Sequence, residues 1–221
     1  LYVNDRKKES PFAIEEIYGG VMYKENSGDD MISVNFSVDG VPIFDISNYG
    51  MHPILCSVNE FASEKRQVSM ILCSLYCGSG KVPNINANLT QFVRECNELR
   101  QSGFQYIYKK KLYTKYCLLL CGICDSIARQ EIRNVTQFNG TYGCGFCKHS
   151  GEQVPKGLGY VRLYLIDNEG NGFGEGLRTH DGTLIHAETL EKGVQGHSVL
   201  FDAEGVMLFA VYPPTGTILL D

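Results

Sequence analysis

Two aspartates in this 221-residue chain each follow a strand-like run of apolar residues. Asp39 ends the first run, directly before Gly40, and Asp125 ends the run LLLCGICD. Carboxylates at strand ends in α/β folds can meet, because neighbouring strands bring their ends together. Such a pair can hold one or two Mg²⁺ ions, which activate a water or hydroxyl and stabilise the leaving oxygen in phosphodiester chemistry. The alternative is that Asp39 occupies a hairpin turn and Asp125 caps a helix, and spacing alone favours these commoner roles.

A second candidate site is the C-x-x-C knuckle of Cys144 and Cys147, whose neighbouring glycines let the backbone curl around a metal. A tetrahedral zinc site needs four ligands, and no second C-x-x-C pair follows this knuckle in the sequence. Two unpaired surface thiols are the alternative interpretation. The remaining candidate zinc ligands are all histidines, namely His149, His180, His186 and His197.

A short basic run, Lys109 to Lys111, is surrounded by tyrosines and could contact a DNA backbone. A solvated loop is the alternative and the commoner use of such a run. The formal net charge of -5 gives the chain no overall basic field that would capture nucleic-acid phosphates. Any DNA affinity must therefore come from local patches or from other regions.

The elements that must position these residues follow from hydrophobic periodicity. Residues 31–39 alternate like a half-buried strand, and Gly40 is expected to turn the chain into a hairpin with residues 41–46. Residues 88–102 have helical spacing, with Asn or Thr as N-cap and Gly103 as C-cap. Residues 112–124 form an apolar run typical of a central strand covered on both faces. Further elements are expected as a helix over 126–134 and strands over 53–58, 69–76 (buried), 159–166 and 205–212.

Composition indicates a soluble globular protein, with 43% hydrophobic and 20% charged residues. No apolar run approaches the roughly 20 residues of a membrane span, and the charged start does not resemble a signal sequence, so we expect no membrane partner and no secretion. The nine cysteines are an odd number and several lie in apolar runs, where burial is expected: Cys73, Cys77, Cys117, Cys121 and Cys124. A reducing compartment, the nucleus or the cytoplasm, fits this usage.

Five sequence blocks occur in an order that resembles animal transposase-like proteins related to the CACTA (En/Spm) group. The blocks are VDGVPIF, KVPNINANLTQFVRECNEL, LLCGICDSIARQEI, QFNGTYGCGFCKHSGE and LRTHDGTLIHA. The resemblance covers residues 33–220, and the block at 137–151 is its most specific part. Hydrolase, zinc-protease and kinase signatures are absent from the sequence, so these classes offer little competition.

The resemblance implies a ribonuclease H-fold enzyme whose Asp, Asp and Glu bind Mg²⁺ for DNA strand cleavage and transfer. Asp39 would be the first carboxylate and Asp125 the second. Cys144 and Cys147 would bind Zn²⁺ in an insertion before the Glu, with His180 as a candidate partner. The chain departs from the family pattern at residues 212–221, which lack the Met-His segment of relatives, and it shows no counterpart of the catalytic Glu.

We therefore expect an α/β fold in three parts: a lead-in over 1–30, a ribonuclease H-like mixed-sheet core over 31–134, and a Gly-rich, zinc-binding insertion over 135–221. Two functions fit this expectation. The first is a fragment or degenerate copy of a Mg²⁺-dependent DDE transposase, inactive alone, with DNA as partner of the full-length protein and self-association into a homo-oligomer. The second is a non-enzymatic interaction module that retains the fold while the metal site is idle.

Overall fold

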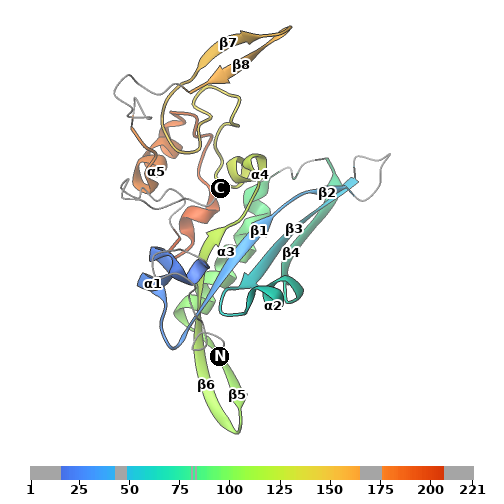
Figure 1. Cartoon of the computed structure of the whole chain (residues 1–221), viewed down its shortest axis with the longest axis vertical. Coiled ribbons are helices and arrows are strands. Elements are labelled where there is room, and N and C mark those ends of the chain that lie inside the picture. The colour runs from blue at the N-terminus through green and yellow to red at the C-terminus, as the bar shows by residue number, and fades with distance from the viewer. Residues whose placement is uncertain (1–15, 43–48, 81, 83, 165–175, 207–221) are drawn as a thin grey trace. The chain divides into compact units, whose positions relative to one another are not determined.

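The computed structural model describes residues 16–42, 49–80, 82, 84–164 and 176–206, and it confirms the expected α/β class (Figure 1). The chain divides into two compact units. Unit 1 comprises the described residues up to Asp125 together with Asp202–Val206, and unit 2 comprises Ser126–Phe201. The expected boundary between core and insertion, after Asn134, lies inside unit 2. None of the helices in the described ranges combines the length and the apolar composition that a membrane span requires.

Unit 1 is built on a six-stranded mixed sheet. Strand β3 pairs antiparallel with β1 and β2 on one flank and with β4 on the other. Strand β6 runs parallel to β1 on its other side, and β5 pairs antiparallel with β6. The strands are β1 (Met31–Val38), β2 (Val41–Pro42), β3 (Tyr49–Val58), β4 (Ile71–Ser79), β5 (Phe104–Tyr108) and β6 (Lys111–Gly122).

The predicted hairpin at Gly40 is wrong, because β2 continues along the same flank of β3 as β1. Val38 pairs with Ile54 and Val41 pairs with Met51, so the register runs on without a slip and places Asp39 opposite Pro53. The amide of Asn59 donates to the carbonyl of Ser33 (3.0 Å). The backbone amide and carbonyl groups of odd-numbered residues of β1 therefore point toward β3. Pro53 has no amide hydrogen to donate at the corresponding position, which accounts for the gap between β1 and β2.

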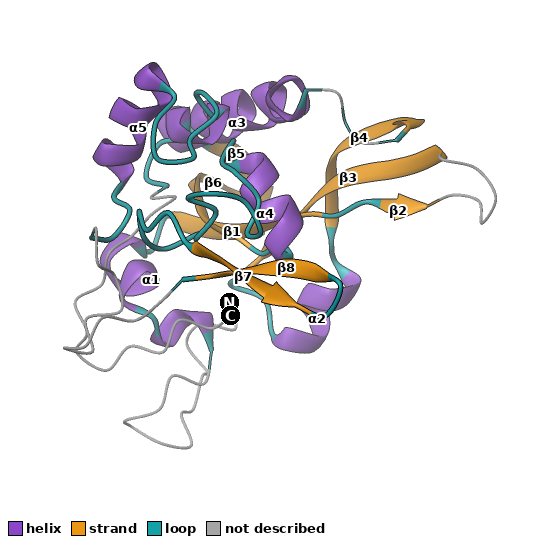
Figure 2. Cartoon of the chain, turned by 90° about the horizontal axis from the view of Figure 1, so that it is seen from above, coloured by secondary structure: helices purple, strands orange, loops and turns teal. Residues whose placement is uncertain are grey.

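The sheet is covered on both faces, and Figure 2 shows α3 on one side and α1 with α2 on the other. Even-numbered side chains of β1 point to α3 (Ile85–Gln101), where the rings of Phe36 and Phe92 lie 5.5 Å apart. On the opposite face, Tyr23 of α1 (Val21–Asn26) packs with Leu118 and Leu120 of β6. The predicted central strand over 112–124 is therefore confirmed as β6, but its continuous burial is limited to Cys117–Leu120, and its first residues are exposed.

Two sequence predictions of burial are wrong. Ser33 and Asn35 of β1 were expected to face solvent, yet both are buried because α1 and the segment after β3 cover that face. Strand β4 was expected to be buried, yet it is an edge strand whose apolar side chains are largely exposed. Its cysteines, Cys73 and Cys77, are consequently exposed rather than buried.

Helix α3 begins three residues earlier than predicted. The side chain of Asn84 accepts a hydrogen bond from the amide of Ala87, so Asn84 is the N-cap. At the other end the amide of Gly103 donates to the carbonyl of Leu99 (3.1 Å), and the positive φ of Gly103 (66°) ends the helix as predicted. The short helix η2 (Ile17–Gly19) and helix α2 (Ser63–Val68) complete unit 1.

Unit 2 contains little regular structure. The predicted helix after Asp125 is confirmed as α4 (Ser126–Ile132), and the predicted strand near residue 160 is confirmed as β8 (Gly159–Leu163), which pairs with β7 (Glu152–Lys156). Helix α5 (His180–Thr189) follows in the chain. The short helix η3 (Val199–Asp202) ends at Asp202, where the chain returns to unit 1. The predicted strand over 205–212 lies largely outside the described residues. The departure from the family pattern at 212–221 lies wholly outside them.

Candidate carboxylate and cysteine sites

The parallel pairing of β1 and β6 brings the ends of the two aspartate-bearing strands to one edge of the sheet. Phe36 pairs with Gly122, and the carbonyl of Phe36 accepts a hydrogen bond from the amide of Ile123 (2.7 Å). Asp39 and Asp125 each stand three residues beyond this last pair. The sheet thus places the two carboxylates at corresponding positions after neighbouring strands, as expected for parallel strand ends.

Both aspartates are exposed. The Oδ1 atom of Asp39 accepts a hydrogen bond from the amide of Gly40 (2.7 Å), which fixes the carboxylate beside its own backbone. Asp125 directly precedes α4, the position at which a helix N-cap stands. Among the described residues no group of three or more His, Cys, Asp or Glu side chains gathers closely enough to hold a metal. The pair would therefore supply two oxygen ligands of a Mg²⁺ site and leave the others to water or further groups.

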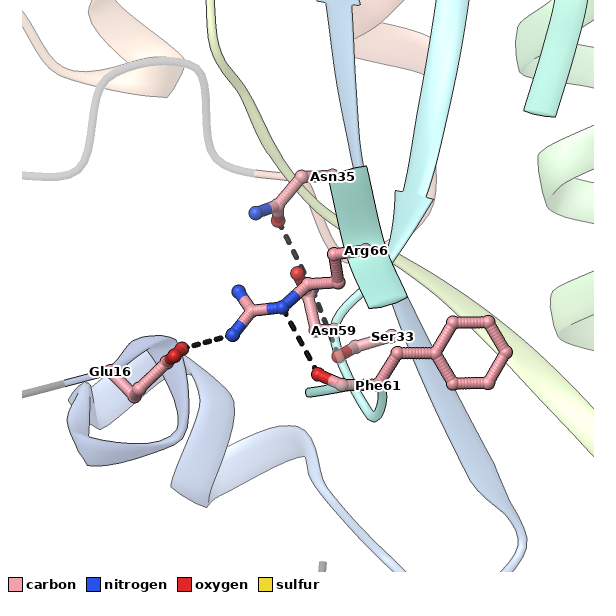
Figure 3. A network of polar contacts seen from close by, with 6 residues as sticks. All are labelled: Glu16, Ser33, Asn35, Asn59, Phe61 and Arg66. Carbon is pink, nitrogen blue, oxygen red and sulfur yellow. Dashed lines mark hydrogen bonds and ion pairs between the residues drawn. The ribbon is translucent and has the colours of Figure 1, made fainter. Parts of the chain in front are cut away.

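A buried polar network lies on the face of β1 that α1 covers, and no local sequence pattern predicted it (Figure 3). The Nδ2 atom of Asn59 donates to the side-chain oxygens of Ser33 and Asn35, both at 3.1 Å. The buried carboxylate of Glu60 accepts hydrogen bonds from the Ser33 amide, the Ser33 hydroxyl and the Tyr23 hydroxyl. The hydrogen bond from the Tyr23 hydroxyl to Glu60 attaches α1 to this network and so to the sheet.

Arg66 extends this attachment. Its Nε atom donates to the carbonyl of Phe61 (3.1 Å) and its guanidinium forms an ion pair with Glu16 (Figure 3). A cavity of about 310 Å³ lies beside Arg66 and is lined mainly by serine, amide and apolar side chains. The cavity has no carboxylate, thiol or imidazole in its lining, so it offers binding contacts without acid–base chemistry.

The predicted knuckle of unit 2 has the local geometry of a curled C-x-x-C loop. The Sγ atom of Cys144 accepts hydrogen bonds from the amides of Phe146 and Cys147, both at 3.4 Å. Cys147 is buried, and burial together with the nearby Cys144 sulfur raises the pKa of its thiol. The two cysteines lie close together, and a structural zinc site would need two further ligands beside their sulfurs.

Arg178 holds the knuckle in place by hydrogen bonds, and no sequence pattern predicted this role. Its side chain is 2% exposed, and it donates to the carbonyls of Cys144 (2.9 Å), Tyr142 (2.6 Å) and Lys192 (2.8 Å). Burial lowers the pKa of this guanidinium, and the nearby sulfurs of Cys144 and Cys147 oppose that shift. Arg178 therefore joins three loop segments that are distant in sequence.

Two of the candidate histidine ligands of unit 2, His180 and His197, pack against the ring of Phe201, and the His197 centroid lies 5.8 Å from it. His180 packs edge-on against Phe201 at 5.0 Å, and its buried Nδ1 atom has no hydrogen-bond partner among the described residues. The Nδ1 atom of His149 accepts from the amide of Gly151 (2.8 Å). Burial and the nearby Lys148 lower the pKa of His186. The predicted trio of Cys144, Cys147 and His180 does not form a metal-ligating group in the described residues.

Comparison with known proteins does not identify the chain. No protein-family model matches it, and no curated protein is significantly similar to it.

Proposed function

We propose that the chain carries the first two metal-binding carboxylates of a DDE-type DNA transposase catalytic domain with a ribonuclease H-like sheet. One observation carries the proposal: β1 and β6 are parallel neighbours, and Asp39 and Asp125 follow their last pair at equal distance along the chain. Mg²⁺ held there would activate the attacking water or hydroxyl and stabilise the leaving oxygen. DNA is the corresponding substrate, and the nucleus is the corresponding place of action.

The residues of this chain would contribute binding and positioning. Asp39 and Asp125 would offer anionic oxygens, and the strand pairing through Phe36 and Ile123 would hold the two segments at a fixed separation. The exposure of both side chains leaves room for a phosphate group. A third carboxylate would have to complete the site, because two aspartates leave most of the coordination positions of the metal to water.

An interaction module derived from a transposase is the second candidate function. The observation that favours it is the absence of a third metal-ligating side chain beside Asp39 or Asp125 in the described residues. In that case the carboxylates keep their structural roles, Asp39 bonded to the Gly40 amide and Asp125 in front of α4.

Calorimetric titration of Mn²⁺ and Mg²⁺ into the full chain distinguishes the two functions. We expect binding by the unmodified chain and its loss in the double variant Asp39→Asn, Asp125→Asn. The matched control is Asp29→Asn, Asp181→Asn, which removes the same charge from two other exposed aspartates and should leave binding unchanged. No binding by the unmodified chain, or equal binding by all three proteins, would contradict the carboxylate site.

Zinc content, measured in parallel, tests the knuckle separately. We expect zinc to co-purify with the chain and to be lost from the variant Cys144→Ser, Cys147→Ser. A metal-free chain with both cysteines freely alkylated would show that the two thiols are unliganded.

A further inference from the structure

The strands β5 and β6 form a two-stranded ribbon that extends beyond the rest of unit 1, at the lower end in Figure 1. All five residues of β5 are exposed, and β6 is the one strand of the described ranges that pairs with β5. Tyr108 pairs with Lys111, so a loop of two residues, Lys109 and Lys110, closes the tip. The ribbon is therefore a solvated part of the sheet, as β4 is at the other edge.

Cross-strand pairing sorts the side chains of the ribbon onto two faces. Directly opposed residues share a face, and the pairs Tyr106–Tyr113 and Tyr108–Lys111 lie on the same face as Phe104. We name this surface the aromatic face; it comprises Phe104, Tyr106, Tyr108, Lys111 and Tyr113. The rings of Tyr106 and Tyr113 stack with their centroids 5.4 Å apart and their planes at 18°. Four large rings thus line one exposed side of the ribbon.

The charge of the ribbon is opposite to that of the chain. Residues 103–124 contain no Asp or Glu, whereas the whole chain has a net charge of -5. Lys115 is buried and pairs with Asp30, so the solvated cations are the three lysines at the tip. Two of them lie against rings: Lys109 is 5.2 Å from the Tyr108 centroid and Lys111 is 5.4 Å from that of Tyr113.

The backbone of the tip is unfavourable for the residues it carries. Lys109 and Lys110 have φ values of 48° and 63°, the left-handed region that a two-residue hairpin loop of type I′ requires at both positions. Asn-Gly is the favoured pair there, because a side chain with a Cβ is strained in that region. Two lysines at the tip are therefore poor choices for stability, and backbone strain of this kind is common where a residue serves binding.

We propose that the aromatic face and the lysine tip bind single-stranded nucleic acid. Bases would stack on the exposed rings, and phosphates would contact Lys109, Lys110 and Lys111. A single strand fits better than a duplex, because only unpaired bases offer their flat faces to aromatic side chains. The interaction goes beyond the proposed metal site, since it uses none of that site's residues and needs no divalent ion.

Fluorescence anisotropy with a labelled 20-nucleotide mixed-sequence DNA strand, in EDTA and at low salt, tests this directly. The first variant is Lys109→Asn, Lys110→Gly, which relaxes the turn while it removes two cations. We expect its affinity to fall by about tenfold, and the slope of log K against log salt to flatten by about 1.4, at roughly 0.7 per lost phosphate contact. Its melting temperature should be equal or higher, so the loss cannot come from unfolding. The matched control is Lys24→Gln, Lys65→Gln, which removes the same charge from exposed positions and should bind like the unmodified chain.

The second pair of variants tests the rings. Tyr108 is 56% exposed, so its replacement leaves the core intact. We expect Tyr108→Ala to weaken binding on the order of 5- to 100-fold and Tyr108→Phe to keep it, because a stacked base requires the ring and not the hydroxyl. Unchanged affinity in the lysine variant or in Tyr108→Ala would overturn the proposal, as would tighter binding of the corresponding duplex. Because EDTA removes divalent ions, the result is independent of the Asp39 and Asp125 site.

Discussion

Four thiols of unit 1, on β3, β4, α3 and β6, shift one another's pKa, and the direction of the shift differs between them. They are Cys56, Cys73, Cys96 and Cys117. Burial raises the pKa of Cys96 to about 12 and that of Cys117 to about 11, so both are protonated at neutral pH. Cys73 differs, because a hydrogen bond from the Cys56 thiol on the neighbouring strand lowers its pKa. The same hydrogen bond raises the pKa of Cys56. Cys73 is also exposed, so reagents can reach the thiol whose pKa is lowered.

We predict that Cys73 is alkylated faster than the buried thiols and that Cys56→Ala moves its reaction to higher pH. A lowered pKa means that the thiolate is populated at lower pH, and loss of the donor removes that stabilisation. Iodoacetamide labelling followed across pH 6 to 10 by peptide mass spectrometry measures the shift. Cys121→Ala is the control, because burial and Cys124 set the pKa of Cys121, and Cys121 is not among the groups that shift the Cys73 pKa. Identical Cys73 profiles in the unmodified chain and in Cys56→Ala would contradict the prediction.

At the scale of single residues, the candidate site residues that could be predicted from the sequence are those marked by a local sequence pattern. Asp39 and Asp125 stood out because each ends an apolar run, and the structure confirms that both follow strands of one sheet. Glu60 and Arg178 were not identified, although both are buried and heavily hydrogen-bonded. Their partners, such as Ser33 and Tyr142, lie 27 and 36 residues away, and no local periodicity encodes such contacts.

At the scale of elements, the junction between α3 and β5 depends on one glycine. Gly103 has φ of 66°, and a Cβ at this position would lie 2.7 Å from the carbonyl oxygen of Lys115. We predict that Gly103→Ala destabilises the chain by about 2–4 kcal/mol, combining a left-handed backbone penalty of about 1–2 kcal/mol with the clash. Guanidinium unfolding monitored by far-UV circular dichroism measures the loss.

Gly80 supplies the matched control for this prediction. Its φ of 77° is also left-handed, but no atom lies within 4 Å of an added Cβ. Gly80→Ala should therefore cost only the backbone penalty, about 1–2 kcal/mol. Equal losses in the two variants would show that the contact with the Lys115 carbonyl adds nothing.

Element types followed from the sequence more readily than element partners did. Residues of α3, β6 and α4 were assigned correctly because their apolar spacing is local. The pairing of β2 was predicted incorrectly, because alternation alone does not say which strand a segment joins. In addition, Pro53 of β3 interrupts the run of backbone hydrogen bonds at the point between β1 and β2. The exposure of β4 was missed for the same reason: an apolar run does not reveal whether a strand is central or at an edge.

At the scale of the whole molecule, the two units are stabilised by different means. Unit 1 has a sheet with apolar and polar packing on its two faces, whereas unit 2 consists mostly of loops with short elements. Loops without a large apolar core need polar contacts to hold them, and Arg178 supplies three of these between distant segments. We infer that unit 2 depends on this one side chain far more than unit 1 depends on any single polar residue.

Replacement of Arg178 by Met keeps the size of the side chain but leaves the carbonyls of Tyr142, Cys144 and Lys192 without their donor. We predict a loss of about 3–5 kcal/mol, since hydrogen bonds from a charged donor contribute roughly 1.5–3 kcal/mol each and the removed guanidinium recovers part of its own desolvation. Hydrogen exchange with mass spectrometry should show lost protection in unit 2, including the bridge between Val135 and Val194.

Arg162→Met is the control for this prediction, because Arg162 also donates to three carbonyls, those of Asn139, Ser150 and Gly151, but through a less buried side chain. Its loss should be about 1 kcal/mol or less, with unit 2 still protected. In both variants the amides of β1 and β6 should stay protected, because their hydrogen bonds and packing lie within unit 1. Simultaneous loss of protection in β6 and in unit 2 after the Arg178 change would mean that the two units unfold as one cooperative body, and the dependence on Arg178 would then belong to the entire chain.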